Sequence, residues 1–253
     1  MKDPTRRFST RVENYVRFRP HYPQAVIDTL RRECGLRPDH VVADIGSGTG
    51  ILTALFIANG NAVHAVEPNP EMRGAAERSL GTAPLFRSVA ARAEDTTLPP
   101  ASVDLIAAGQ AFHWFDREAA RREFRRILRP RGFVALVWNE RASDTTPFLR
   151  DYEALLRRWS TDYDEVDHRQ VTGEVLGAFY GPGGLRDATF HHSQHFDLEG
   201  LTGRLLSSSY VPEPGEPGYE PMLAACRDLF ERYRSGDTVA FEYATRLFWG
   251  RLD

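Results

Sequence analysis

Three glycines at alternate positions stand out near the start of the chain. The segment from Val41 to Gly50 reads VVADIGSGTG, so an apolar run leads into Gly46, Gly48 and Gly50. Glycine allows a positive φ and lets ligand atoms approach the main chain. The residues that follow have a helical pattern, and the free N–H groups at a helix start favour an anionic ligand group. The segment therefore predicts a ligand-binding loop between a strand and a helix.

A carboxylate follows the glycines at the sequence separation that is typical of doubly wound folds. Glu67 ends the apolar run AVHAV, 21 residues after Gly46. In doubly wound folds an acid at this place accepts hydrogen bonds from both hydroxyls of a ribose. Dinucleotide enzymes prefer the spacing G-x-G-x-x-G, which would need glycine where Ile51 stands, and there is no phosphate-loop, serine-hydrolase or zinc-protease motif. The ligand expected is a nucleoside that carries an anionic group, with a nicotinamide cofactor as the alternative.

The elements that must hold these residues alternate between strand and helix. Short apolar runs predict strands at 41–45, 62–66, 85–89, 103–109 and, after a turn at RPRG, 132–138. Apolar residues at helical spacing predict helices at 22–34, 51–59, 70–80 and 116–128. After Trp138 the patterns predict strands at 187–198 and 238–250 and helices at 147–159, 171–179, 201–207 and 219–233. This alternation is typical of a doubly wound, mostly parallel α/β sheet of seven strands.

These segments together resemble the class I S-adenosylmethionine-dependent methyltransferases. VVADIGSGTG is similar to their first motif, AVEPNPEM to their acidic position and LRPRGFVALVWN to their fifth-strand motif. The block ARAEDTTLPPASVDLIAAGQAFHWFD resembles the small-molecule branch, a methyltransferase type 11 domain, which includes trans-aconitate methyltransferases and the methyltransferases of ubiquinone and menaquinone biosynthesis. The similarity runs motif by motif from about Phe8 to Asn139. It implies a Rossmann-like fold and S-adenosylmethionine as the cofactor, with S-adenosylhomocysteine as the product.

The resemblance also assigns the cofactor site. The methionine part of the cofactor would lie at the glycine loop, the ribose at the acid, the adenine at the end of the third strand and the methyl group after the fourth. The residues so implied are Asp44, Gly46, Ser47, Gly48, Gly50, Glu67, Pro68, Ala93, Glu94, Gln110 and Ala111. Many relatives carry Asp just before the alanine at position 93, whereas this chain has Arg92.

Methyl transfer mainly requires that an acceptor atom be aligned and that water be excluded. A carboxylate acceptor is already ionised, but a hydroxyl or carbon acid must lose a proton to a base. His113, in AFHWFD after the fourth strand, is the candidate for that base, or else it shapes the pocket. The other residues predicted to bind the acceptor are Tyr15, Arg19 and Tyr22 of the amino-terminal arm, with Trp114 and Trp138. Arginine suits a carboxylated acceptor because it can bind the group through two hydrogen bonds.

Composition limits the other possibilities. Lys and Arg total 32 against 35 Asp and Glu, a net charge of -3, so no overall field would draw the chain to nucleic acid or an anionic membrane. Two distant cysteines, Cys34 and Cys226, predict neither a disulfide scaffold nor a zinc site, and HHSQH on a strand would bring at most two histidines together. We expect no metal. The charged first residues and the lack of a long apolar run predict a cytoplasmic protein.

We therefore expect one methyltransferase domain over residues 1–253. It would comprise an arm and helix at 1–40, a cofactor-binding core at 41–139 and, at 140–253, the last strands with helical insertions near 139–184 and 198–236 that cover the pocket. The expected reaction is methyl transfer to a small organic molecule, with a carboxylate oxygen favoured over a phenol or an enolisable carbon. A nicotinamide-dependent oxidoreductase and a catalytically silent S-adenosylmethionine-binding protein remain as alternatives.

Overall fold

The strands of the protein form one mixed sheet. The computed structural model describes residues 11–160, 171–182 and 184–252, so Phe8 and parts of the first predicted insertion (161–170 and 183) lie outside the described residues. The strands found there are β1 Val41–Ile45, β2 Ala62–Val66, β3 Phe86–Val89, β4 Val103–Gly109, β5 Leu128–Arg141, β6 Arg186–Phe196 and β7 Val239–Gly250. Their order is β3-β2-β1-β4-β5-β7-β6. The first five strands are parallel, and β7 is antiparallel to both β5 and β6. The predicted doubly wound, mostly parallel seven-stranded sheet is confirmed.

Five of the helices described begin where a side chain caps the first turn. They are α1 Val12–Phe18, α2 Ala25–Cys34, α3 Ile51–Ala58, α4 Pro70–Leu80, α5 Arg117–Ile127, α6 Pro147–Trp159, α7 Gly173–Tyr180, α8 Leu198–Leu206, α9 Tyr219–Tyr233 and the 3₁₀ helix η1 Phe112–Trp114. Asn69, Asp116 and Thr146 each accept a hydrogen bond from the main-chain N–H three residues on, which fixes the starts of α4, α5 and α6. Helices α1 and η1 were not predicted.

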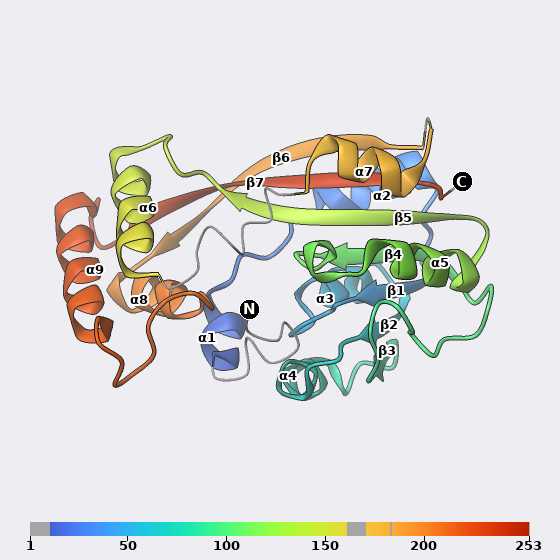
Figure 1. Ribbon diagram of the computed structural model, residues 1–253, viewed down its shortest axis with the longest axis horizontal. Coiled ribbons are helices and arrows are strands. Elements are labelled where there is room, and N and C mark those ends of the chain that lie inside the picture. Colours follow the sequence, from blue (N-terminus) through green and yellow to red (C-terminus); the bar gives the residue numbers. More distant parts are fainter. Residues whose placement is uncertain (1–10, 161–170, 183, 253) are drawn as a thin grey trace.

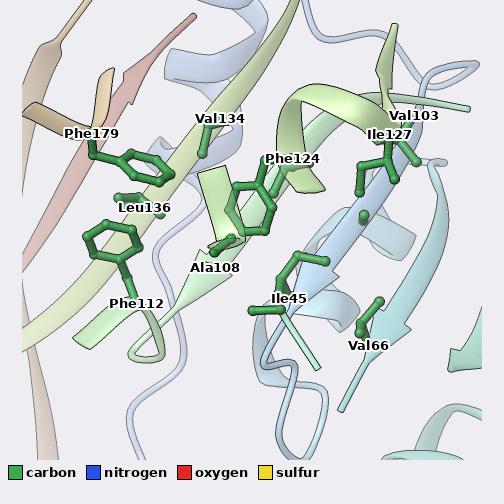
Figure 2. Close-up of a cluster of buried hydrophobic side chains, with 14 of the residues drawn as sticks. Ile45, Val66, Val103, Ala108, Phe112, Phe124, Ile127, Val134, Leu136 and Phe179 are labelled. Atoms are coloured by element: carbon green, nitrogen blue, oxygen red, sulfur yellow. The ribbon is translucent and has the colours of Figure 1, made fainter. Parts of the chain in front are cut away.

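Helices cover both faces of the sheet. Figure 2 shows the core on one face, where Phe124 and Ile127 of α5 and Phe179 of α7 lie among strand residues such as Val134 and Leu136. On the other face, α2 and α3 pack against β1, β4 and β5, and α4 packs beside them on β2 and β3. The carboxyl ends of the parallel strands stay free of these helices, which is where open α/β sheets bind ligands.

A second hydrophobic core lies beyond the carboxyl end of β5. Helices α6, α8 and α9, here called the cap, gather there, and β6 and β7 reach from the sheet into them (Figure 1). One face of β7 serves both cores: Val239, Phe241 and Tyr243 pack in the cap, and Leu247 and Trp249 pack against the sheet core. The predicted insertions are therefore joined to the sheet by continuous strands.

The RPRG segment differs from its prediction. It was predicted as a turn before the strand, but it forms an irregularity within β5. Leu128 already pairs with Val103 of β4, and the next pair is Phe133 with Leu105. Arg131 has a φ of 69°, so the extra residues loop out of the ladder. This irregularity lies at the end of the sheet away from the predicted site. Among the described residues, no helix combines the length and apolar character needed to cross a bilayer.

Candidate functional site

The glycine loop joins β1 to α3 and requires its glycines. Gly46, Gly48 and Gly50 have φ values of 68°, 57° and 86°, which only glycine adopts readily. A Cβ atom on Gly46 would lie 2.6 Å from Cβ of Ala111, so space as well as conformation excludes a side chain. The N–H groups of Gly46 and Ser47 both donate to the carbonyl of Val66. The loop is thereby attached to the end of β2, next to Glu67.

The carboxylate of Glu67 organises this end of the sheet. Its two oxygens accept hydrogen bonds of 2.8 Å from the main-chain N–H groups of Gly48 and Asn69. Burial raises the pKa of Glu67, while these two hydrogen bonds act in the opposite direction. Each carboxylate oxygen can accept more than one hydrogen bond, so Glu67 can hold the loop and still accept from ribose hydroxyls.

Asp44 lies at the end of β1, where its motif places it. It is fully buried beneath the loop, where the hydroxyl of Thr53 donates to one of its oxygens at 2.6 Å. Burial, with a smaller contribution from the charge of Glu67, raises the pKa of Asp44 to about 7. Its other oxygen has no hydrogen-bond partner among the described residues. Asp44, Ser47 and Gly50 lie outside the lining of the adjoining cavity, so they shape the loop from behind.

A cavity lies in front of the loop, where four parallel strands end. Its walls include most of the residues predicted to bind the cofactor: Gly46, Gly48, Glu67, Pro68, Ala93, Glu94, Gln110 and Ala111, with Trp114 and Phe115. Glu94 accepts a hydrogen bond from the N–H of Asp116 at 2.9 Å and lies 3.4 Å from Arg92. The volume of this cavity is about 130 Å³, below the roughly 300–1,000 Å³ of usual ligand pockets.

A second, larger cavity adjoins the first. It encloses about 430 Å³ and shares Tyr15, Gln110 and Trp114 with the cofactor-side cavity. His113, whose ring centroid is 4.6 Å from that of Trp114, lines the larger cavity, as does Arg19. The two cavities meet at the three shared residues, here called the junction. Two of these, Tyr15 and Trp114, were predicted to bind the acceptor, and two other predicted residues, His113 and Arg19, line the larger cavity.

The arm reaches the site because α1 is fastened to the cap. The guanidinium of Arg11 donates to the carbonyls of Ser208 and Val211, and that of Arg19 donates to Ser207 at 2.8 Å. Gly203 of α8 lies so close to Phe18 that a Cβ atom there would be 2.1 Å from the ring. In Figure 1, α1 lies between α8 and α4. The arm therefore closes one side of both cavities.

Trp138 and Tyr22 line neither cavity. Trp138 is buried in the sheet core, with its ring edge-on to Phe112 and Phe248. Tyr22 packs against Gly109 and the α2 side of the sheet, and burial raises its pKa well above its ordinary value. Trp138 was predicted to bind the acceptor, yet it packs in the sheet core. Successive residues of a strand face opposite sides, and its neighbour Asn139 lines the larger cavity instead.

Several residues of the larger cavity had no sequence signal. They come from the end of β5, from β7 and from the cap, and they include Asn139, Arg141, Arg204, Tyr210 and Tyr243. Of the histidines in HHSQH, His191 is exposed at the cavity, whereas His192 stacks on Tyr243 with ring centroids 5.3 Å apart. Alternation along the strands would have indicated which residues share a face, but nothing in the sequence indicated that the cap lies against the arm.

The fold and the loop define a doubly wound α/β protein with a glycine-lined cavity at the ends of its strands. Comparison with known proteins narrows this class. Residues 43–136 match the model of the methyltransferase domain family. An uncharacterized methyltransferase of Schizosaccharomyces pombe is 32% identical over 244 residues, which cover 95% of this chain and 94% of that protein. An uncharacterized methyltransferase of Mycobacterium tuberculosis is 39% identical over 173 residues, which cover 68% and 67% of the two chains.

A solved structure has the same fold. A putative type II methyltransferase from Anaeromyxobacter dehalogenans superimposes with a TM-score of 0.67 at 24% identity, covering 92% of this chain and 98% of that one. The chain belongs to the methyltransferase domain family and is a class I S-adenosylmethionine-dependent methyltransferase. The residues of the cofactor-side cavity fit this cofactor, because an acid, a glycine-lined approach and aromatic side chains converge there.

Proposed function

We propose that the protein methylates an oxygen of a small organic acid that binds in the larger cavity. The observation that carries this proposal is the junction of the two cavities at Tyr15, Gln110 and Trp114. An acceptor in the larger cavity would meet the cofactor there. The arginines of the larger cavity favour a molecule that carries a carboxylate, since guanidinium groups match the geometry and charge of that group. An oxygen of such an acid is the favoured acceptor. A phenol or an enolisable carbon is the second candidate.

The chain's own residues would hold the cofactor and exclude water. In this proposal the glycine loop receives the methionine part, Glu67 accepts from the ribose hydroxyls, and Ala93 and Glu94 meet the adenine. When bound, S-adenosylmethionine supplies a methyl group on a positive sulfur, which keeps the electrons of the broken bond while an acceptor oxygen forms the new one. Gln110 and Trp114 would align that oxygen, and Tyr15 of the arm would keep the junction dry.

His113 has a role that depends on the acceptor. A carboxylate is ionised near neutral pH and requires no base. A phenol or carbon acid would lose its proton to His113, which lines the larger cavity next to Trp114. With a carboxylate acceptor, the same imidazole would serve to shape the cavity wall.

The partners and compartment belong to the same proposal. A net charge of -3 and an enclosed cavity of about 430 Å³ favour a small-molecule acceptor over nucleic acid. The two unpaired cysteines, Cys34 and Cys226, suit a reducing cytoplasm.

The test is to incubate the protein with methyl-labelled S-adenosylmethionine and a fractionated extract of small molecules. Label in a base-labile ester would support carboxylate methylation, and label in an ether or C-methyl product would support the second candidate. If no fraction accepts label although S-adenosylhomocysteine binds, either the extract lacks the acceptor or the protein is a silent cofactor-binding protein. If NADH binds and S-adenosylhomocysteine does not, the oxidoreductase alternative replaces the proposal.

A further inference from the structure

The larger cavity contains a buried arginine that forms no ion pair with an acid among the described residues. Arg204 of α8 is 6% exposed, and its guanidinium donates to the hydroxyls of Tyr243, Ser207 and Ser208 at 3.3–3.5 Å. All of these partners are neutral hydroxyl groups. Among the described residues, no carboxylate lies within ion-pair distance of Arg204. Its protein partners are therefore hydroxyl groups at long hydrogen-bond distances.

A second guanidinium adds to this uncompensated charge. Arg19 of the arm donates to the carbonyl of Ser207, and its guanidinium lies 4.8 Å from the ring centroid of Tyr15. Its Nε is buried with no hydrogen-bond partner among the described residues. Burial and then the like charge of Arg204 lower the pKa of Arg19. Two cations thus share one wall of the cavity, and the charge of Arg204 makes the charged form of Arg19 less favourable.

Other buried arginines of this region are compensated. Arg141 forms an ion pair with Glu153, and Arg11 lies 3.4 Å from Glu213 besides its carbonyl partners. The acids that line the same cavity have other partners as well. Glu140 pairs with Arg246 at 3.4 Å, and Glu242 accepts from the hydroxyl of Thr145. The remaining one, Asp144, is exposed. The Arg19 and Arg204 pair is thus distinct in lacking an acid.

We propose that Arg204 and Arg19 form an anchor for an oxyanion group of the acceptor, a carboxylate or a phosphate, that is separate from the atom that receives the methyl group. An uncompensated buried charge destabilises a protein, and a bound oxyanion would offset it through charge-assisted hydrogen bonds. The part of the proposal that concerns methylation depends on the proposed function, whereas binding of the oxyanion does not.

The anchored group is a poor methyl acceptor for a chemical reason. Hydrogen bonds from two guanidinium groups would occupy the oxygen lone pairs that a new carbon–oxygen bond needs. The reacting atom must instead lie at the junction, near Gln110 and Trp114. The acceptor is therefore at least bifunctional, and its methylated product keeps the negative charge of the anchored group.

Binding can be measured by titration calorimetry with S-adenosylhomocysteine at saturation. The probes are succinate, 3-phosphonopropionate and the neutral isostere succinamide. We expect one or both anions to bind and succinamide not to bind. Arg204→Met and Arg19→Met should each weaken the binding of the anion at least tenfold. The exposed Arg232→Met, on α9, is the matched control and should change nothing. Because Arg19 is only half-buried, its variant tests the anchor even if Arg204→Met fails to fold.

The results of the calorimetry and of the labelling experiment each support or overturn the anchor. Equal affinity in the wild type and both folded variants, or no preference for the anions over succinamide, overturns the anchor. The tighter of the two anions identifies a carboxylate or a phosphate site. In the labelling experiment, the methylated product should be retained by an anion-exchange resin, and a neutral product overturns the bifunctional acceptor. If the variants lose anion binding but the wild type transfers no label, the anchor stands and the proposed function fails.

Discussion

The side-chain amide of Gln110 donates a 2.9 Å hydrogen bond to the main-chain carbonyl of Asn139. Gln110 follows β4 with a φ of 55°, unusual for a residue other than glycine, and this bond offsets part of that strain. The Asn139 side chain accepts from Thr245 at 2.6 Å and donates to the carbonyls of Pro20 and His21. Asn139 thus positions Gln110, which lies at the junction of the two cavities, and also binds β7 and the arm.

Replacing Asn139 should destabilise the protein. Asn139→Ala leaves the buried hydroxyl of Thr245 and two arm carbonyls with fewer partners, so we expect a loss of about 1–3 kcal/mol in the free energy of unfolding. Urea denaturation measures this loss. Thr245→Val removes the other partner, and the double variant should be less destabilised than the sum of the two single variants. Strict additivity would contradict the coupling.

Replacing Glu67 should weaken cofactor binding. Glu67→Gln keeps the size of the side chain but removes its charge and one acceptor oxygen, so we expect S-adenosylhomocysteine to bind more weakly by about 1.5–3 kcal/mol. Calorimetry measures the affinity, and Glu118→Gln on the exposed first turn of α5 is the control. Unchanged affinity would remove Glu67 from the ribose site.

The buried Asp44 should make stability depend on pH. Its pKa of about 7 in the folded protein exceeds its ordinary value of 3.8, so the folded state holds a proton that the unfolded state releases. This contribution to stability is complete below pH 4, falls as the pH rises from about 4 to 7, and then levels off. Asp44→Asn removes the titration. Unfolding free energies measured from pH 4 to 8 should therefore fall less for the variant than for the wild type, by on the order of a few kcal/mol. Parallel curves would show that Asp44 is ionised throughout.

His113→Ala separates the two roles of the imidazole. If the acceptor is a phenol or carbon acid, turnover should fall by roughly 10²–10⁴-fold and lose its dependence on a base near neutral pH, while cofactor affinity stays the same. If the acceptor is a carboxylate, we expect mainly a rise in KM with the pH profile retained. The pH dependence of kcat distinguishes the two results.

Gly203→Ala tests the attachment of the arm to the cap. The added Cβ atom would lie 2.1–2.7 Å from Phe18, so α1 or the ring must move, at a cost of about 1–3 kcal/mol. We expect a lower Tm and faster proteolysis within the arm. Gly177→Ala is the matched control, because no atom lies within 4 Å of its added Cβ and alanine favours the helix. Equal behaviour of the two variants would mean that the contact between α1 and α8 is not tight.

The sequence predicted the sheet, the glycine loop and Glu67 because those features depend on local patterns. Apolar runs such as VVADI and VDLIAAG allow few alternatives, and the capping residue Asn69 marks the start of α4. The larger cavity was harder to predict. Arg204 reaches this cavity because α8 packs on α1. Trp138 was predicted to line the cavity, but side chains alternate along β5 and its neighbour Asn139 lines the cavity instead. Such contacts join segments far apart in the chain and leave no motif.

The strands β5, β6 and β7 have a consequence for how such an enzyme can diversify. They carry the wall of the larger cavity from the sheet to the cap through main-chain hydrogen bonds, along registers that run from Arg186 to Phe196 and from Val134 to Arg141. Main-chain bonds do not depend on the identity of side chains. Substitutions can therefore accumulate on the cap while the backbone beneath them keeps its distance from the glycine loop. In such a scaffold, the specificity for the acceptor can change while the site of methyl transfer stays the same.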